Sequence, residues 1–168
     1  SLEDKYALYT IGFDSRNNSI FHASTGLVYL DKNLKLIKEL KGPVLERGPN
    51  DPFWAASPHV IKEGTKFKMF YTSSYDYKYI KSINKSHHLY DIKLRVSNNP
   101  EYFRNNSKTV VTALNPNEYA IARPCLIDLK GELYIFYCKR ETEFSKDYMI
   151  FSKKINSNKI SIPEKKDN

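Results

Sequence analysis

The sequence lacks the features that mark several large classes of protein. No apolar run approaches the length needed to cross a bilayer, and the first residues, SLEDKYAL, show no signal-peptide pattern. The two cysteines form no C-x-x-C pair, and His87 and His88 have no Cys or His partners at metal-site spacing. We therefore expect no membrane partner, no bound metal and no cofactor.

The cysteines also bear on location. Cys125 and Cys138 fall on two expected strands that turn near residues 129–131, where they are not directly opposite each other. This placement disfavours a disulfide, and reduced thiols are typical of a reducing compartment. We therefore expect a cytoplasmic protein.

Helix signals are absent as well, because no stretch holds a sustained 3.6-residue apolar period with caps. Glycine is scarce, at six residues, whereas thirteen tyrosines and nine phenylalanines bring the aromatic share to 14%. Aromatic side chains pack well on a half-buried pleated sheet. Residues 90–97, YDIKLRVS, alternate apolar and polar throughout, which is the pattern of a half-buried strand. The chain is predicted to be all-β.

A repeat organises the chain. Residues 57–74 align without a gap with residues 123–140, and four pairs are identical: Pro58 with Pro124, Ile61 with Ile127, Phe70 with Phe136 and Tyr71 with Tyr137. Each copy predicts a hairpin, with turns at residues 63–65 and 129–131. Tyr148-Met-Ile echoes Tyr90-Asp-Ile, so the repeat extends beyond its hairpin.

Three segments are predicted to be loops. Residues 42–58 contain four prolines, which cannot donate to a sheet ladder. Residues 73–88 are rich in Tyr, Lys and Ser, and residues 114–124 form a second proline-bounded segment. The two proline-bounded segments precede the two copies of the repeat, so they would lie at equivalent places in the fold.

The formal charge of +8 favours anionic partners in general terms. The lysines are scattered rather than gathered with aromatic residues on one face, as nucleic-acid binding requires. Nucleic-acid binding is therefore a minor alternative, and it predicts an affinity that falls steeply with salt.

With these motifs in place, the chain resembles the glycosidase-like five-bladed β-propellers, which include arabinanase/xylosidase-type and invertase-type glycoside hydrolases and bacterial relatives. The matching stretches are YTIGF (9–13), GLVYLDKNLKLI (26–37), GPVLERGPNDPFWAASPHVIKEG (42–64), KMFYTSS (68–74), YDIKLRVS (90–97) and ARPCLIDLKGELYIFYCKR (122–140). The resemblance implies one domain over residues 1–168, a partial β-propeller with blades near 5–41, 57–114 and 123–162. A β-sandwich is the alternative fold.

A complete five-bladed ring would need roughly twice this length, so we expect about three blades, the first and last incomplete. Open blade edges can pair with another copy, which predicts a homo-oligomer.

The resemblance also implies a ligand over the central channel, where the proline-bounded loops would lie. Cleavage of a glycosidic bond needs two carboxylates on either side of the bond, and Glu118 with Asp51 is the pair we nominate. Asp51-Pro52 resembles the Asp-Pro motif of the invertase-type enzymes, whose aspartate binds sugar hydroxyls; Glu46 is the alternative partner. The predicted substrate-binding residues are Glu46, Arg47, Trp54, Ser57, His59, Arg123 and Arg140.

Each of these residues also has a purely structural interpretation. Asp51 can be a turn residue, Glu46 and Arg47 a surface ion pair, Trp54 a packing residue, and Arg123 a buried partner of Glu118. Two functions therefore remain open: a carbohydrate-active propeller that binds a glycan, as a hydrolase or transferase, and a non-catalytic binding or assembly module.

Overall fold

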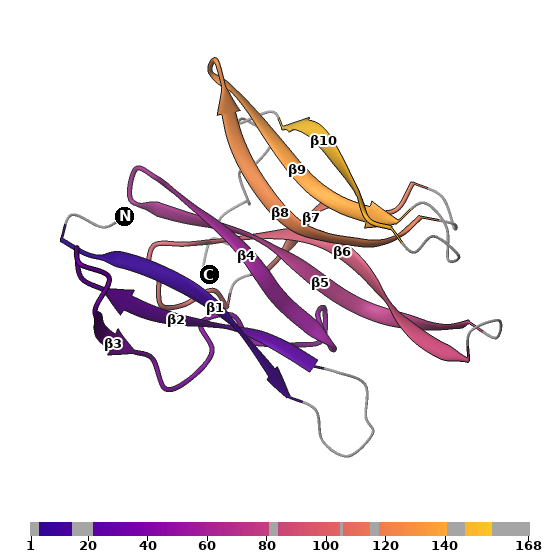
Figure 1. The fold of residues 1–168 in the computed structure, drawn as a ribbon, viewed down its shortest axis with the longest axis horizontal. Coiled ribbons are helices and arrows are strands. Elements are labelled where there is room, and N and C mark those ends of the chain that lie inside the picture. Colours follow the sequence, from indigo (N-terminus) through magenta and orange to yellow (C-terminus); the bar gives the residue numbers. More distant parts are fainter. Residues whose placement is uncertain are drawn as a thin grey trace, which may run out of the picture.

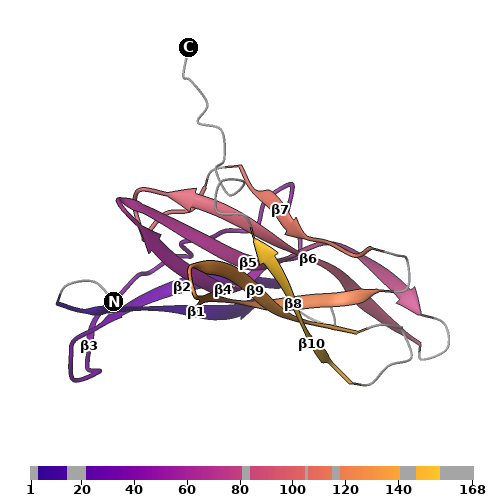
Figure 2. The same ribbon diagram turned by 90° about the horizontal axis from the view of Figure 1, so that it is seen from above.

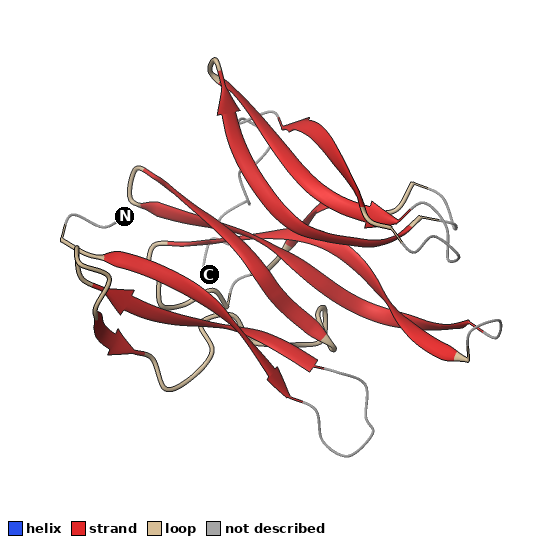
Figure 3. Cartoon of the chain, in the orientation of Figure 1, coloured by secondary structure: helices blue, strands red, loops and turns tan. Residues whose placement is uncertain are grey.

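The computed structural model describes residues 4–14, 22–80, 84–104, 106–114, 118–140 and 147–155. All regular secondary structure in this part of the chain is β-strand (Figure 3). Within the same residues, no helix is long and apolar enough to span a membrane.

The strands form two open sheets. The larger has the order β1-β2-β4-β5-β6-β7, with β3 paired to β2 off this path, and the smaller has the order β10-β9-β8. The larger sheet comprises β1 (Tyr6–Asp14), β2 (His22–Leu30), β3 (Leu36–Glu39), β4 (Trp54–Glu63), β5 (Lys66–Ile80), β6 (Lys85–Ser97) and β7 (Lys108–Val111). The smaller comprises β8 (Tyr119–Leu129), β9 (Glu132–Arg140) and β10 (Met149–Ile155).

Three groups of strands follow one another through the molecule: β1–β3, β4–β7 and β8–β10 (Figures 1 and 2). The first two groups count as one sheet only because β2 and β4 meet in parallel at a single pair, Ala23 and Trp54. All other pairings in both sheets are antiparallel. The assignment of blades near 5–41, 57–114 and 123–162 stays a prediction, and residues 156–162 of the third lie outside the described residues.

Both hairpins of the repeat form as predicted. β4 ends at Glu63 and β5 begins at Lys66, with Gly64 between them at φ 58°. β8 ends at Leu129 and β9 begins at Glu132, with Gly131 at φ 82°. Glycine suits both turns, because residues with a side chain rarely adopt a positive φ. Cys125 pairs with Phe136 across this second hairpin, and both cysteines are free thiols.

The loop predictions are wrong in part. Residues 73–88 are not one long loop, because β5 and β6 continue as a two-stranded ribbon in which Tyr77 pairs with His88. The proline-rich segment becomes strand at Trp54, so Pro58 lies inside β4, at a bulge where no ladder hydrogen bond is needed. Likewise β8 starts at Tyr119, and Pro124 lies at a bulge within it.

Two apolar clusters hold the three groups together. The first joins the β1–β3 group to β4 and β5, and it contains Leu27, Tyr29, Val44, Leu45, Ala55, Met69, Tyr71 and Phe103. The second joins β5–β7 to the smaller sheet, and it contains Phe70, Ile92, Leu94, Val111, Ile121, Leu126 and Ile135. The strict alternation of β6 thus serves two interfaces, because its apolar face meets the smaller sheet and its charged face meets the 44–53 segment. The all-β, open-sheet fold is confirmed.

Candidate functional site

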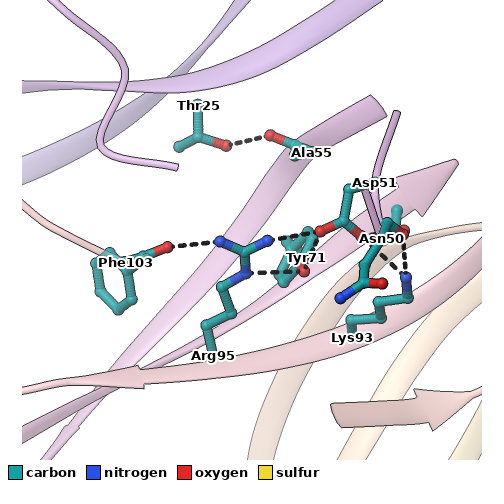
Figure 4. Close-up of polar contacts among 9 residues, drawn as sticks. Thr25, Asn50, Asp51, Ala55, Tyr71, Lys93, Arg95 and Phe103 are labelled. Carbon is teal, nitrogen blue, oxygen red and sulfur yellow. Dashed lines mark hydrogen bonds and ion pairs between the residues drawn. The ribbon is translucent and has the colours of Figure 1, made fainter. Parts of the chain in front are cut away.

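Asp51 lies at the centre of a buried polar network between the first two strand groups (Figure 4). Its side chain is fully buried. Arg95 Nη2 donates to one carboxylate oxygen at 2.6 Å and Lys93 Nζ to the other at 3.0 Å. The Tyr71 and Ser73 hydroxyls also donate to the carboxylate. Four donors therefore occupy both oxygens of Asp51.

Lys93 and Arg95 also donate to backbone carbonyl groups. Lys93 Nζ donates to the carbonyl oxygen of Asn50 at 2.6 Å, and Arg95 Nη1 to that of Phe103 at 2.8 Å. Burial alone would raise the pKa of the Asp51 carboxyl. The hydrogen bonds from Ser73 and Lys93 and the two positive charges outweigh burial and hold this pKa below its ordinary value. The carboxylate is therefore ionised, and it ties the 44–53 segment to β5 and β6.

Glu118, the other predicted catalytic residue, lies in a different cluster. Its carboxylate accepts a hydrogen bond from Lys139 Nζ at 2.6 Å and one from the Leu114 backbone N–H at 2.9 Å. Arg123 is exposed, so it is not the buried partner of Glu118 that the structural interpretation allowed, and Glu118 contacts Lys139 instead. Asp51 and Glu118 share none of these partners.

Asp91, on the charged face of β6, is a buried carboxylate that the sequence did not single out. It is 9% exposed, and its Oδ1 atom has no hydrogen-bond partner among the described residues. Burial raises the pKa of Asp91, and this effect exceeds the opposing ones of the Thr112 hydrogen bond and the Lys93 charge. The fold therefore disfavours the ionised form of this side chain.

Asp91→Asn is expected to increase the free energy of unfolding at pH 7 by up to about 1 kcal/mol, since it removes a disfavoured charge. Because the folded pKa is raised, the penalty is absent below the ordinary value of 3.8 and grows as the pH rises above it. Urea titrations of both proteins at pH 3.5 and pH 7 measure this. A variant that is less stable than the parent at pH 7 contradicts the expectation.

The two copies of the repeat share a strained backbone position. Ser57 has φ 54° and Arg123 has φ 58°, and each directly precedes a proline and lies in a bulge. A residue before proline normally avoids helical conformations, so each position costs of the order of 1–3 kcal/mol. The two bulges lie close together, because the Arg123 N–H donates to Thr72 Oγ1 and Thr72 pairs with Ala56. Strain of this kind is frequent at ligand sites.

Next to these bulges, aromatic rings and arginines from both sheets converge. The Trp54 and Tyr90 rings lie 5.8 Å apart, and His88 stacks on Tyr90 at 5.6 Å. The guanidinium groups of Arg123 and Arg140 lie 5.8 Å and 4.4 Å from the centroid of the Tyr148 ring. We name this surface the aromatic–arginine face, and it consists of Trp54, His88, Tyr90, Arg123, Arg140 and Tyr148.

Tyr90 connects the two halves of this face. Burial, together with the nearby Tyr148 hydroxyl, raises the pKa of Tyr90 to about 12, so the Tyr90 phenol is a neutral hydrogen-bonding group at pH 7. Trp54 Nε1 is inaccessible to solvent and has no hydrogen-bond partner among the described residues. Tyr148 is 44% exposed. The face thus combines accessible ring surface with hydroxyl donors and two permanent positive charges.

Three predicted substrate-binding residues lie away from this face. Glu46 forms an exposed ion pair with Arg104 at 3.4 Å, so its predicted surface pairing with Arg47 is replaced by this one. Arg47 donates to the Pro52 carbonyl oxygen. His59 pairs with Phe70 across the β4–β5 hairpin, and burial lowers the pKa of its imidazole.

Arg47 also borders an open hollow of about 390 Å³ on the β1–β2 strand pair. The hollow exists because the residues beneath it are short, with Gly12 opposite Ser24 and Thr10 opposite Gly26. Phe13, which lines the hollow, contacts Trp54 at 5.5 Å. The hollow therefore lies next to the aromatic–arginine face. A binding experiment has to distinguish a ligand in the hollow from one on the face.

Of the predicted binding residues, the structure places Arg123 and Arg140 against the Tyr148 ring and Trp54 against the Tyr90 ring, with Ser57 on the equivalent bulge. It adds Tyr90 and Tyr148, which the sequence analysis did not nominate. The sequence signal for Tyr90 and Tyr148 was the Tyr-x-Ile motif that both begin. The motif indicated two equivalent strands, but it did not show that the two tyrosines lie near each other.

Comparison with known proteins supports the fold class. No family model and no curated protein sequence matches this chain. Among solved structures, the xylan β-1,4-xylosidase from Bacillus halodurans C-125 matches with a TM-score of 0.62 at 14% identity. The match covers 90% of this chain and 29% of that enzyme. At this identity the likeness shows the fold alone, and it is consistent with a partial glycosidase-like propeller.

Proposed function

We propose that this chain is a carbohydrate-binding propeller module that holds a saccharide at the aromatic–arginine face. The observation that carries the proposal is the convergence of Trp54, Tyr90 and Tyr148 with Arg123 and Arg140, next to the strained bulges at Ser57 and Arg123. These residues come from two sheets and five segments of the chain, so their meeting is a property of the fold and not of one local sequence.

The chemistry of the face suits a sugar. An aromatic ring stacks on the apolar face of a pyranose, while guanidinium and phenol groups bind its hydroxyls. The Trp54 N–H, which has no acceptor among the described residues, is a further donor for a ligand hydroxyl if the ring shifts. The structural neighbour is a xylan β-1,4-xylosidase, an enzyme named for a saccharide substrate. This likeness favours a saccharide over other ring-bearing ligands.

Binding without catalysis is the form of the proposal that the contacts favour. Both nominated carboxylates have cationic partners: Asp51 with Lys93 and Arg95, and Glu118 with Lys139. A glycosidase needs two carboxyl groups that face one substrate bond, separated by roughly 5–10 Å. Hydrolase or transferase activity with Asp51 and Glu118 stays a prediction, as do pairing of copies through open sheet edges and a cytoplasmic location.

The test is Tyr148→Ala, because Tyr148 is exposed and contributes little to the apolar clusters. Loss of one stacking ring is expected to weaken saccharide binding about tenfold. Tyr102→Ala is the matched control, since Tyr102 is 47% exposed and lies under the guanidinium of Arg104 at 4.9 Å, remote from the face. Saturation-transfer NMR and calorimetry with xylobiose, other xylo-oligosaccharides and a panel of common mono- and disaccharides measure the affinities.

A third variant separates the face from the neighbouring hollow. A Cβ atom added at Gly12 meets no atom within 4 Å, so Gly12→Val is expected to fill part of the hollow. Loss of binding in Gly12→Val with retention in Tyr148→Ala would move the ligand to the hollow and overturn the proposed location. Absence of binding by every saccharide in the panel would overturn the proposed function.

A further inference from the structure

The smaller sheet turns an apolar face away from the β4–β7 group. Leu126 and Ile135, on its inner side, belong to the apolar cluster shared with β5–β7. Side chains alternate along a strand and paired residues share a side of the sheet, so the neighbours of these two residues point outward. We name this surface the β8–β10 outer face, and it consists of Cys125, Ile127, Tyr134, Phe136 and Ile150. In the part of the chain that the structure describes, none of the five belongs to either apolar cluster.

The repeat shows how such a face packs when it is covered. Phe70 and Ile92 are fully buried between the β4–β7 group and the smaller sheet. Their equivalents, Phe136 and Ile150, hold the same ladder positions in the smaller sheet. Phe136 is only half-buried, however, and Ile150 is 75% exposed. The β8–β10 outer face therefore has the residues and the register of an interface between strand groups, but its side chains are accessible.

A second apolar face lies on the β1–β3 group, at the other end of the row of three strand groups (Figure 1). Leu27 and Tyr29 point inward, into the first apolar cluster. Their neighbours on β2, and the residues paired with those neighbours, point outward. We name this surface the β1–β3 outer face, and it consists of Tyr6, Leu8, Val28, Leu30 and Leu36. Leu8 is 49% exposed and Leu36 is 62% exposed.

The two outer faces match in chemistry. The smaller sheet covers Phe70 and Ile92 with aliphatic side chains and one tyrosine, namely Leu126, Leu133, Ile135 and Tyr137. The β1–β3 outer face offers the same types, four aliphatic side chains and Tyr6. Stacked repeats bury a continuous core because each one covers the apolar face of its neighbour.

We propose that the β8–β10 outer face of one copy of this chain binds the β1–β3 outer face of a second copy. The two sheets pack face to face through apolar side chains, as the β4–β7 group packs against the smaller sheet. This contact differs from the hydrogen-bonded pairing of open sheet edges. It also uses no residue of the aromatic–arginine face, so it goes beyond the saccharide proposal and does not depend on it.

The first experiment measures the mass of the full chain in solution. Because the two faces differ, the contact is head to tail and can extend from copy to copy. Sedimentation velocity and light scattering over a wide range of concentrations are expected to show an average mass that rises above that of a monomer. A chain that stays monomeric throughout overturns the proposal.

Ile150→Asp and Leu8→Asp each place a carboxylate in one of the two faces, and each is expected to weaken association at least about tenfold. Ile127→Asp repeats the first substitution on a different strand. Leu114→Asp is the matched control, because Leu114 is 87% exposed and belongs to neither face, so it leaves association unchanged. Circular dichroism and thermal midpoints show that each variant is folded.

A mixture of two variants tests the pairing of the faces directly. Ile150→Asp keeps its β1–β3 outer face and Leu8→Asp keeps its β8–β10 outer face, so together they are expected to form a dimer with one copy of each and no larger species. Absence of this mixed dimer, or association of Ile150→Asp as strong as that of the parent, overturns the proposal. Dimers formed by Leu8→Asp alone overturn the head-to-tail contact and indicate that the β8–β10 outer face binds itself.

Discussion

Asp51→Asn lowers the free energy of unfolding by about 3–5 kcal/mol at pH 7, the cost of leaving a buried ion pair without one partner. The substitution keeps the size of the side chain but removes the charge that offsets Lys93 and Arg95. Both cations are about nine-tenths buried, and each also donates to a backbone carbonyl, so neither can turn out to water without losing further bonds. Urea titration at pH 7 measures the loss.

Glu46→Gln is the control for this prediction. Its ion pair with Arg104 is exposed on both sides, so its removal is expected to change the free energy of unfolding by less than about 1 kcal/mol. Equal effects of the two variants would contradict the structural role assigned to Asp51. If Asp51→Asn is as stable as the parent and loses only an enzymatic activity, the catalytic prediction for Asp51 prevails.

The pH dependence provides an independent check. The folded pKa of Asp51 is below its ordinary value of 3.8, so its contribution to stability is fully present above that value. The contribution disappears as the pH falls through the folded pKa, when the carboxyl becomes protonated in both states. The stability difference between the parent and Asp51→Asn is therefore constant from pH 5 to pH 7 and shrinks in acid. A difference that grows in acid would rule out this account.

The sequence predicted most of the fold because the repeat and the alternation of residues 90–97 follow directly from sheet geometry. It failed at residues 73–88, where the composition resembles a loop. There the strands form a ribbon whose exposed tyrosines alternate with charged residues, and pairing of β5 with β6 satisfies the backbone. Composition records solvent exposure, whereas the pairing that makes a strand depends on a partner that lies elsewhere in the sequence.

The candidate site was predictable in parts but not as an assembly. Trp54 and Arg123 were nominated from the proline-bounded loops and Arg140 from the end of the second aromatic strand, and the two arginines lie against one ring, that of Tyr148. Asp51 was nominated for its local Asp-Pro motif, yet what determines its environment are Lys93 and Arg95, more than 40 residues away. No local motif encodes such partners. The same holds for Tyr148, because its two arginines come from different strands.

The second large effect concerns the interface between the two sheets. Leu94→Ala is expected to lower the free energy of unfolding by about 3 kcal/mol. Leu94 is fully buried on β6, within the cluster that also contains Ile121 of β8 and Ile135 of β9. Its removal leaves a cavity between sheets that no β-ladder connects, so backbone hydrogen bonds cannot compensate. Leu114→Ala is the matched control, because Leu114 is 87% exposed and the same deletion there should change little.

Two spectroscopic probes show whether this interface makes the sheets one cooperative unit. Trp54, the only tryptophan, lies in the larger sheet and reports on it by fluorescence, whereas far-ultraviolet circular dichroism reports on the strands of both. In the parent the two urea transitions should coincide. If the apolar cluster is what couples the sheets, Leu94→Ala shifts both transitions to lower urea and begins to separate them. A shift of less than about 1 kcal/mol with coincident transitions would mean that the smaller sheet is held by other contacts, such as the Arg123–Thr72 hydrogen bond.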